Sequence, residues 1–192
     1  ALALFLAFRL ATILTRALPL RVSYAVGRCA GIAAFYVWPG GRRRSVQNLM
    51  RVAGGDEGKA RRLARASFAN YVVYLVDFFR SFGTDPEDVH RRVDLPEDIW
   101  DRLRAERRGN GIVFMTMHFG NWDMGAAILA LHGFPISAVA DQFPNERLNR
   151  LVVESRQHLG MNIIPAGRTG PGILRALRNN DVVAVPVDIQ QP

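Results

Sequence analysis

Residues 111–123, Gly111-Ile-Val-Phe-Met-Thr-Met-His-Phe-Gly-Asn-Trp-Asp123, decide the fold. An uncharged, apolar run over 112–117 is followed by a Gly-Asn turn and then by helical spacing over 122–131, which is typical of a parallel strand that leads into a crossover helix. The same alternation continues and predicts strands over 136–140, 162–165 and 182–187 and helices over 145–159 and 171–178. The sequence therefore predicts an α/β fold, with a mainly parallel sheet flanked by helices.

The N-terminal segment combines apolar residues with positive charge. The chain has 192 residues and a formal net charge of +8. Residues 1–55 contain eight arginines and no acidic residue, whereas the other 17 basic side chains are balanced by 17 acidic ones. Two helices are predicted, over 1–18 and about 22–38, with Pro19 between them. They form a basic hydrophobic helical hairpin at the N-terminus.

This hairpin is expected to lie in a membrane interface. No uncharged run reaches the ~18 residues that a transmembrane helix needs. A secretory signal also fits poorly, because the first arginine follows eight apolar residues. Arginine-rich apolar helices suit an anionic membrane surface, whereas nucleic-acid binders rarely place their charge in such a segment. A pair of ordinary core helices is the alternative.

The chain is predicted to have two parts. Residues 1–50 form the membrane-associating helical segment, and residues 51–192 form the α/β domain. The single cysteine, Cys29, provides no disulfide framework and favours a cytosol-facing protein. Because the chain begins with Ala and stops directly after a strand pattern, we expect it to be C-terminally incomplete.

His118 and Asp123 are the leading candidates for catalysis. A neutral imidazole can take a proton from a hydroxyl near neutral pH, and a carboxylate can orient the ring and stabilise the imidazolium. No G-x-S-x-G turn is present, so direct transfer to a bound hydroxyl is favoured over a serine intermediate. The alternative is a hydrogen-bonded histidine that ends a core strand, with Asn121 as a plain turn residue.

Three further residues are candidates for substrate binding. Arg156 lies at the edge of the apolar stripe of helix 145–159, where either a substrate anion or an internal carboxylate could balance its charge. Arg168 lies in a glycine-rich loop before a helix, a setting that can cradle an anion. Asp188 follows an apolar strand and should project at the same sheet edge as His118, unless it only caps a loop.

No metal site is predicted. His90, His132 and His158 are scattered and lack an H-x-x-x-H or cysteine partner. The strand-end aspartates, among them Asp141, lie at different junctions, so magnesium is a weak alternative.

Several segments resemble one protein family. His118-Phe-Gly-Asn-Trp-Asp123 is similar to the H-x-x-x-x-D/E signature of glycerolipid acyltransferases, and its HFGNW form resembles the bacterial lipid A biosynthesis acyltransferase family. The basic segment Arg42–Leu49, the element Arg156–Gly160 and the strand end at Asp188 resemble further motifs of that family. Asp at position 123 and the segment Val139–Gln142 are closer to its phosphatidylinositol mannoside acyltransferases.

The resemblance implies a function. It implies His118 as the general base, oriented by its acidic partner Asp123. We take Asn121, Arg156, Arg168 and Asp188 as the candidate substrate-binding residues. The donor would be an acyl thioester of CoA or acyl carrier protein, without a further cofactor. The acceptor would be a hydroxyl of a membrane glycolipid, at the cytoplasmic face of the bacterial plasma membrane.

Two other classes of function stay open at this point. The chain could be a non-catalytic membrane-binding module, or a metal-dependent hydrolase of lipid phosphates. The family's downstream part is missing here, which places the acceptor site outside this chain and leaves open whether the chain is active alone.

Overall fold

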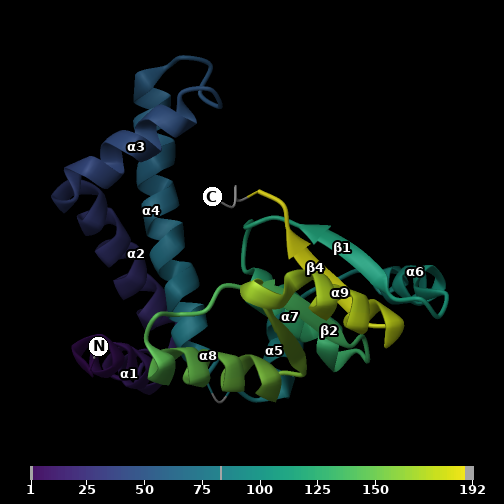
Figure 1. Ribbon diagram of the computed structural model, residues 1–192. Helices are drawn as coiled ribbons and strands as arrows, with labels where there is room; N and C mark the ends of the chain where they lie inside the picture. The colour runs from purple at the N-terminus through teal and green to yellow at the C-terminus, as the bar shows by residue number, and fades with distance from the viewer. Residues whose placement is uncertain (1, 83, 189–192) are drawn as a thin grey trace. The chain divides into compact units, whose positions relative to one another are not determined.

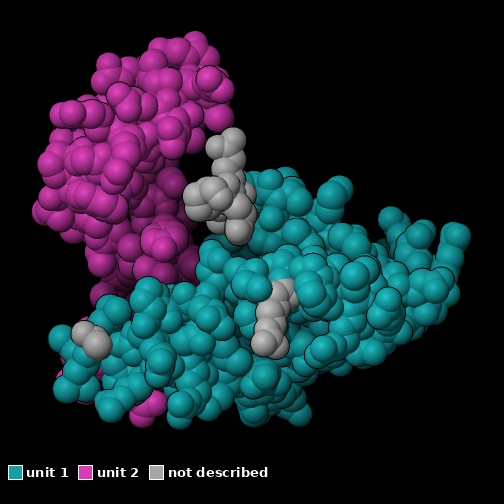
Figure 2. Space-filling view, viewed as in Figure 1, with its two compact units in different colours: residues 1–5, 82–192 teal, residues 6–81 magenta. Residues whose placement is uncertain are grey.

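The computed structural model describes residues 2–82 and 84–188. The chain divides into two compact units, one formed by residues 6–81 and the other by residues 1–5 and 82–192 (Figure 2). Each unit has its own buried residues and is described separately below.

The α/β unit contains a parallel sheet. Among the described residues the strand order is β1-β4-β2-β3, with β1 (Ile112–Thr116), β2 (Ile136–Ala140), β3 (Met161–Pro165) and β4 (Val182–Pro186) (Figure 1). The connecting helices are α7 (Trp122–Leu131), α8 (Glu146–His158) and α9 (Thr169–Arg178), the last preceded by the short 3-10 helix η1 (Ala166–Arg168). The predicted α/β class and parallel sheet are confirmed.

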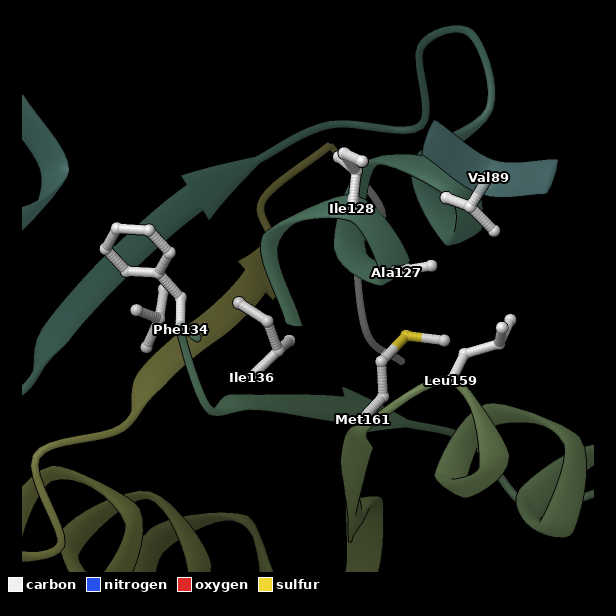
Figure 3. Close-up of a cluster of buried hydrophobic side chains, with 8 residues drawn as sticks. Val89, Ala127, Ile128, Phe134, Ile136, Leu159 and Met161 are labelled. Carbon is white, nitrogen blue, oxygen red and sulfur yellow. The ribbon is translucent and has the colours of Figure 1, made fainter. Parts of the chain in front are cut away.

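Successive strand residues face opposite sides of the sheet, as the period of a strand requires. Val182 packs in a cluster with α7 and the start of β2, whereas Val183 packs with Ala176 of α9. The first cluster is the larger and contains Val89, Ala127, Ile128, Phe134, Ile136, Leu159, Met161 and Val182 (Figure 3). Apolar layers on both faces explain why the strands read as continuous apolar runs.

Two short helices complete the first cluster. These are α5 (Pro86–Arg92) and α6 (Asp98–Arg107). Asp85 caps α5 by accepting a hydrogen bond from the backbone N–H of Glu87 at 2.9 Å, and proline occupies the first helical position. Val89 is fully buried in the cluster, and Trp100 of α6 packs against it.

The unit of residues 6–81 is helical. Its elements are α1 (Leu2–Ala17, of which residues 2–5 belong to the other unit), α2 (Leu20–Val37), α3 (Pro39–Leu49) and α4 (Glu57–Arg80). Both α2 and α3 pack against α4. Gly31 permits this approach, because a Cβ added there would lie 2.5 Å from the carbonyl oxygen of Phe68. Helix α4 thus belongs to the same compact unit as the helices that precede it, and the boundary at residue 50 between a membrane-associating segment and the α/β domain stays a prediction.

Helix α1 exposes apolar side chains. Its exposed leucines and isoleucine are Leu2, Leu4, Leu6, Leu10, Ile13 and Leu14. Phe8 instead contacts α4, with its ring centroid 5.0 Å from that of Phe79. None of the described helices has both the length and the apolar character that crossing a bilayer requires.

Candidate active site

Strands β1 and β4 bring the site together, because they are neighbours in the sheet. Thr116 pairs with Pro186, and the backbone N–H of Val187 donates to the carbonyl of Thr116 at 2.9 Å. His118 and Asp188 follow these paired ends, so both leave the sheet at its carboxyl edge. That edge is where open α/β sheets bind their ligands.

The loop after β1 turns sharply at His118. The backbone N–H of Phe119 donates to the carbonyl of Met117 at 2.8 Å, which closes a three-residue turn with His118 at its centre. Gly120 then adopts a φ of +66°, a conformation that glycine takes without strain. Asn121 ends the loop as the N-cap of α7, accepting from the backbone N–H of Met124 at 3.0 Å.

Asp188 holds His118 through both of its carboxylate oxygens. Oδ1 lies 3.0 Å from Nδ1 of the imidazole, and Oδ2 accepts from the backbone N–H of His118 at 2.8 Å. The side-chain hydrogen bond, followed by the backbone one, lowers the pKa of Asp188 below its ordinary value. An ionised carboxylate only accepts hydrogen bonds, so Nδ1 carries the proton and Nε2 has the free lone pair.

The other ring nitrogen is available for a proton transfer. Within residues 2–82 and 84–188, none hydrogen-bonds Nε2 of His118. The side chain is 30% exposed, and the edge of its ring packs against Trp122 with the ring centroids 4.6 Å apart. The imidazole is thus held at Nδ1 while its side chain stays partly exposed, an arrangement that suits proton transfer.

Asp123 and Arg156 form an ion pair beside this site. Nε of Arg156 lies 2.9 Å from Oδ1 of Asp123, and the two side chains are only 19% and 14% exposed. Asp123 is in the first turn of α7, where the helix dipole also favours a carboxylate. The pair therefore joins α7 to α8, and an internal carboxylate supplies an anion for the arginine on the apolar stripe.

The structure places five of the six predicted site residues in two pairs and a helix cap. His118 pairs with Asp188, Asp123 pairs with Arg156, and Asn121 caps α7. The backbone of Arg168 lies in η1, but its side chain is outside what the structure describes. Sequence reasoning placed Asp188 at the correct edge but did not identify it as the partner of the imidazole. Its position directly after a buried strand was the available signal.

The chain segments that carry His118 and Asp188 expose apolar side chains. Met117 and Phe119 flank it in sequence, Val187 precedes Asp188, and all three are exposed. Val113 and Met115, at two-residue spacing before Met117, are exposed as well. The carboxyl edge of β1 therefore joins one polar, proton-accepting group to an apolar surface.

The arrangement of possible metal ligands was a further question for this site. Among the described residues, no group of three or more histidine, cysteine, aspartate or glutamate side chains is arranged to hold a metal ion.

Comparison with known proteins identifies the family. The family model described as bacterial lipid A biosynthesis acyltransferase matches residues 2–190. A phosphatidylinositol mannoside acyltransferase of Mycolicibacterium smegmatis is 32% identical over 155 residues, which are 79% of this chain and 49% of that protein. One of Mycobacterium tuberculosis (strain CDC 1551 / Oshkosh) is 29% identical over 159 residues, 80% of this chain and 50% of that protein. This chain thus spans about half the length of these curated relatives. It belongs to the bacterial lipid A biosynthesis acyltransferase family.

Proposed function

We propose that this protein is a membrane-associated O-acyltransferase. It moves a fatty acyl group from a thioester of CoA or acyl carrier protein to a hydroxyl of a membrane glycolipid. The observation that carries this proposal is the His118–Asp188 contact at the carboxyl edge of the sheet, with the partly exposed imidazole beside exposed apolar residues in the chain. The family of the chain supports the reaction class, and the names of its relatives support a glycolipid acceptor.

The proposed reaction proceeds in two balanced steps. Nε2 of His118 takes the proton of the acceptor hydroxyl while the hydroxyl oxygen attacks the thioester carbonyl carbon. The tetrahedral intermediate then collapses, the C–S bond breaks, and the thiolate leaves with the proton that the imidazolium returns. The products are an ester and a free thiol, and no further cofactor is needed.

The carboxylate of Asp188 acts on the imidazole. It keeps the proton on Nδ1 before the reaction and stabilises the positive ring once Nε2 has accepted a second proton. Asp123 acts indirectly, because its ion pair with Arg156 fixes the start of α7, which follows the loop that carries His118. We therefore assign Asp123 and Arg156 as positioning residues in this reaction.

Two surfaces suit the proposed substrates. The exposed apolar residues Met115, Met117 and Phe119 suit an acyl chain that approaches His118 along β1. The exposed apolar residues of α1, together with the acid-free basic segment of residues 1–55, suit the surface of an anionic bilayer. In bacteria this would be the cytoplasmic face of the plasma membrane, where acyl thioesters are made.

Lipid mass spectrometry tests the proposal. The protein and its His118→Ala variant are expressed in a bacterial host that lacks the activity, and the glycolipids are compared. We expect a new acylated glycolipid with the wild-type protein and none with the variant at equal protein level. If wild type and variant produce identical lipid profiles, the proposed function is wrong.

A further inference from the structure

A second candidate site lies in the helical unit, on α3 and the start of α4. It is a pocket of about 430 Å³ whose lining includes Arg42 and Arg43 of α3 and Arg61 of α4. The residues that α3 contributes recur at three- and four-residue spacing from Pro39 to Met50 and therefore share one face of the helix. None of the residues of the His118 site lines this pocket.

The positive charge of the pocket is only partly balanced. Glu57 is its single acidic lining residue, and its carboxylate lies 3.9 Å from the guanidinium of Arg61. These two side chains are 71% and 52% exposed, so their pairing is weak. Arg42 donates to the carbonyl of Tyr36 at 3.4 Å, which does not neutralise it, and Arg43 forms no ion pair with any described residue. The lining therefore carries a net charge of two positive units.

The pocket also has apolar lining, and the chain next to α3 exposes apolar side chains. Val46 and Met50 contribute apolar lining. The adjoining chain exposes Val37 (79%) and Trp38 (55%) just before α3, and Val52 (69%) just after it. An exposed tryptophan beside apolar residues and arginines is the composition of a membrane-interface anchor. A small soluble anion would gain nothing from these exposed apolar residues.

We propose that this pocket binds the phosphate group of an anionic phospholipid in the bilayer surface. Arg42 and Arg43 bind the phosphate oxygens through charge-assisted hydrogen bonds, for which the planar guanidinium is well suited. Val46 and Met50 contact the glycerol and first acyl carbons, while Trp38 and its neighbours enter the interface. The proposal rests on the membrane association proposed above but not on acyl transfer.

Monomeric lipid binding tests this proposal, since monomers present no charged surface for the protein to adsorb to. The ligand is a short-chain phosphatidylglycerol below its aggregation concentration, added to the whole chain without acyl donor and followed by calorimetry. The pocket variant is Arg42→Gln with Arg43→Gln. The control is Arg21→Gln with Arg28→Gln, which removes the same charge from exposed positions of α2 that do not line the pocket.

We expect the pocket variant to bind the lipid about tenfold more weakly or worse, because two charge-assisted contacts are lost. The control variant should bind like the wild type, and Glu57→Gln should bind more tightly because the only opposing charge is removed. Inorganic phosphate should bind the wild type more weakly than the lipid does. Melting curves of each variant are measured as a control for folding.

Three outcomes would overturn the proposal. Equal losses in the pocket and control variants would mean general charge attraction, and unchanged binding in the pocket variant would place the lipid elsewhere. Inorganic phosphate binding as tightly as the lipid would identify a site for a soluble anion. The His118→Ala variant should bind the lipid normally, so failure of acyl transfer and failure of this pocket are separate results.

Discussion

Replacing Asp188 with asparagine removes the charge that orients His118 while keeping the shape of the side chain. Both carboxylate oxygens accept hydrogen bonds from His118, one from Nδ1 and one from the backbone N–H. An amide has only one oxygen, so its NH₂ group must face either the backbone N–H or Nδ1. In the first arrangement the amide NH₂ faces the backbone N–H of His118, so two hydrogen-bond donors oppose each other. In the second the NH₂ faces Nδ1, which must then accept a hydrogen bond, so the ring proton moves to Nε2.

Either arrangement impairs the base, and the loss of rate should be large. In serine proteases, where an aspartate holds a histidine in the same way, the corresponding change lowers kcat about 10⁴-fold. The side chain of Asp188 is 37% exposed, so water can partly replace the lost carboxylate. We therefore expect a loss of about 10²–10⁴ in the rate of acyl transfer, with little change in melting temperature.

The assay follows the free thiol released from an acyl thioester in the presence of acceptor. Asp141→Asn is the matched control, because Asp141 is an exposed aspartate that follows the end of strand β2. It should retain wild-type activity. If Asp188→Asn also retained wild-type activity in a folded protein, Asp188 would be a loop residue only. Its role as the catalytic partner of His118 would then be wrong.

Three further predictions follow from the described contacts. Arg156→Lys should lower the free energy of unfolding by about 1–2 kcal/mol, roughly 2–8 °C in Tm, because the ammonium cannot reproduce the partly buried bond to Asp123. Unchanged melting with lost transfer would instead assign Arg156 to substrate. Folding lowers the pKa of Asp188. The contribution of its carboxylate to stability should therefore be complete above pH about 4 and disappear as the pH falls through the lowered pKa. Acid unfolding curves should show this loss of stability for the wild type and not for Asp188→Asn. Binding to anionic vesicles, measured by flotation, should weaken as salt rises and weaken further when Leu6 and Leu10 of α1 are both changed to Asp. The reason is that membrane binding combines charge with exposed apolar surface. Binding that neither change weakens would place the membrane anchor elsewhere.

The α/β unit was largely predictable because its signals are local. Each strand is an apolar run and each crossover helix has its own period. Two of these helices also have an asparagine N-cap, Asn121 for α7 and Asn145 for α8. These signals need no knowledge of the tertiary structure. They located all four described strands to within one residue.

Helix α3 was missed because its first three residues are ones that commonly end helices. Pro39-Gly-Gly reads as the end of a helix, yet Pro39 occupies the first helical position of α3. Gly41 is buried against the ring of Trp38, where an added Cβ would lie 2.6 Å from a ring carbon. A glycine that lowers helix propensity is therefore required for packing.

The partner of His118 could not be identified from spacing alone. Asp123 is close to His118 in sequence, but it lies in α7, which begins at Trp122. There it forms an ion pair with Arg156 of α8. Asp188 is 70 residues away from His118 and becomes its neighbour because β4 lies between β1 and β2. That strand order is a property of the assembled sheet, which no local pattern encodes.

The most direct test of the central claim is the rate of acyl transfer from a labelled acyl thioester to glycolipid by the His118→Ala variant. The matched control is His158→Ala, at an exposed histidine that ends α8. We predict that His118→Ala lowers the rate at least about 10²-fold while folding and vesicle binding persist, and that the control transfers normally. A folded His118→Ala variant that transfers acyl groups as fast as the wild type would contradict the account.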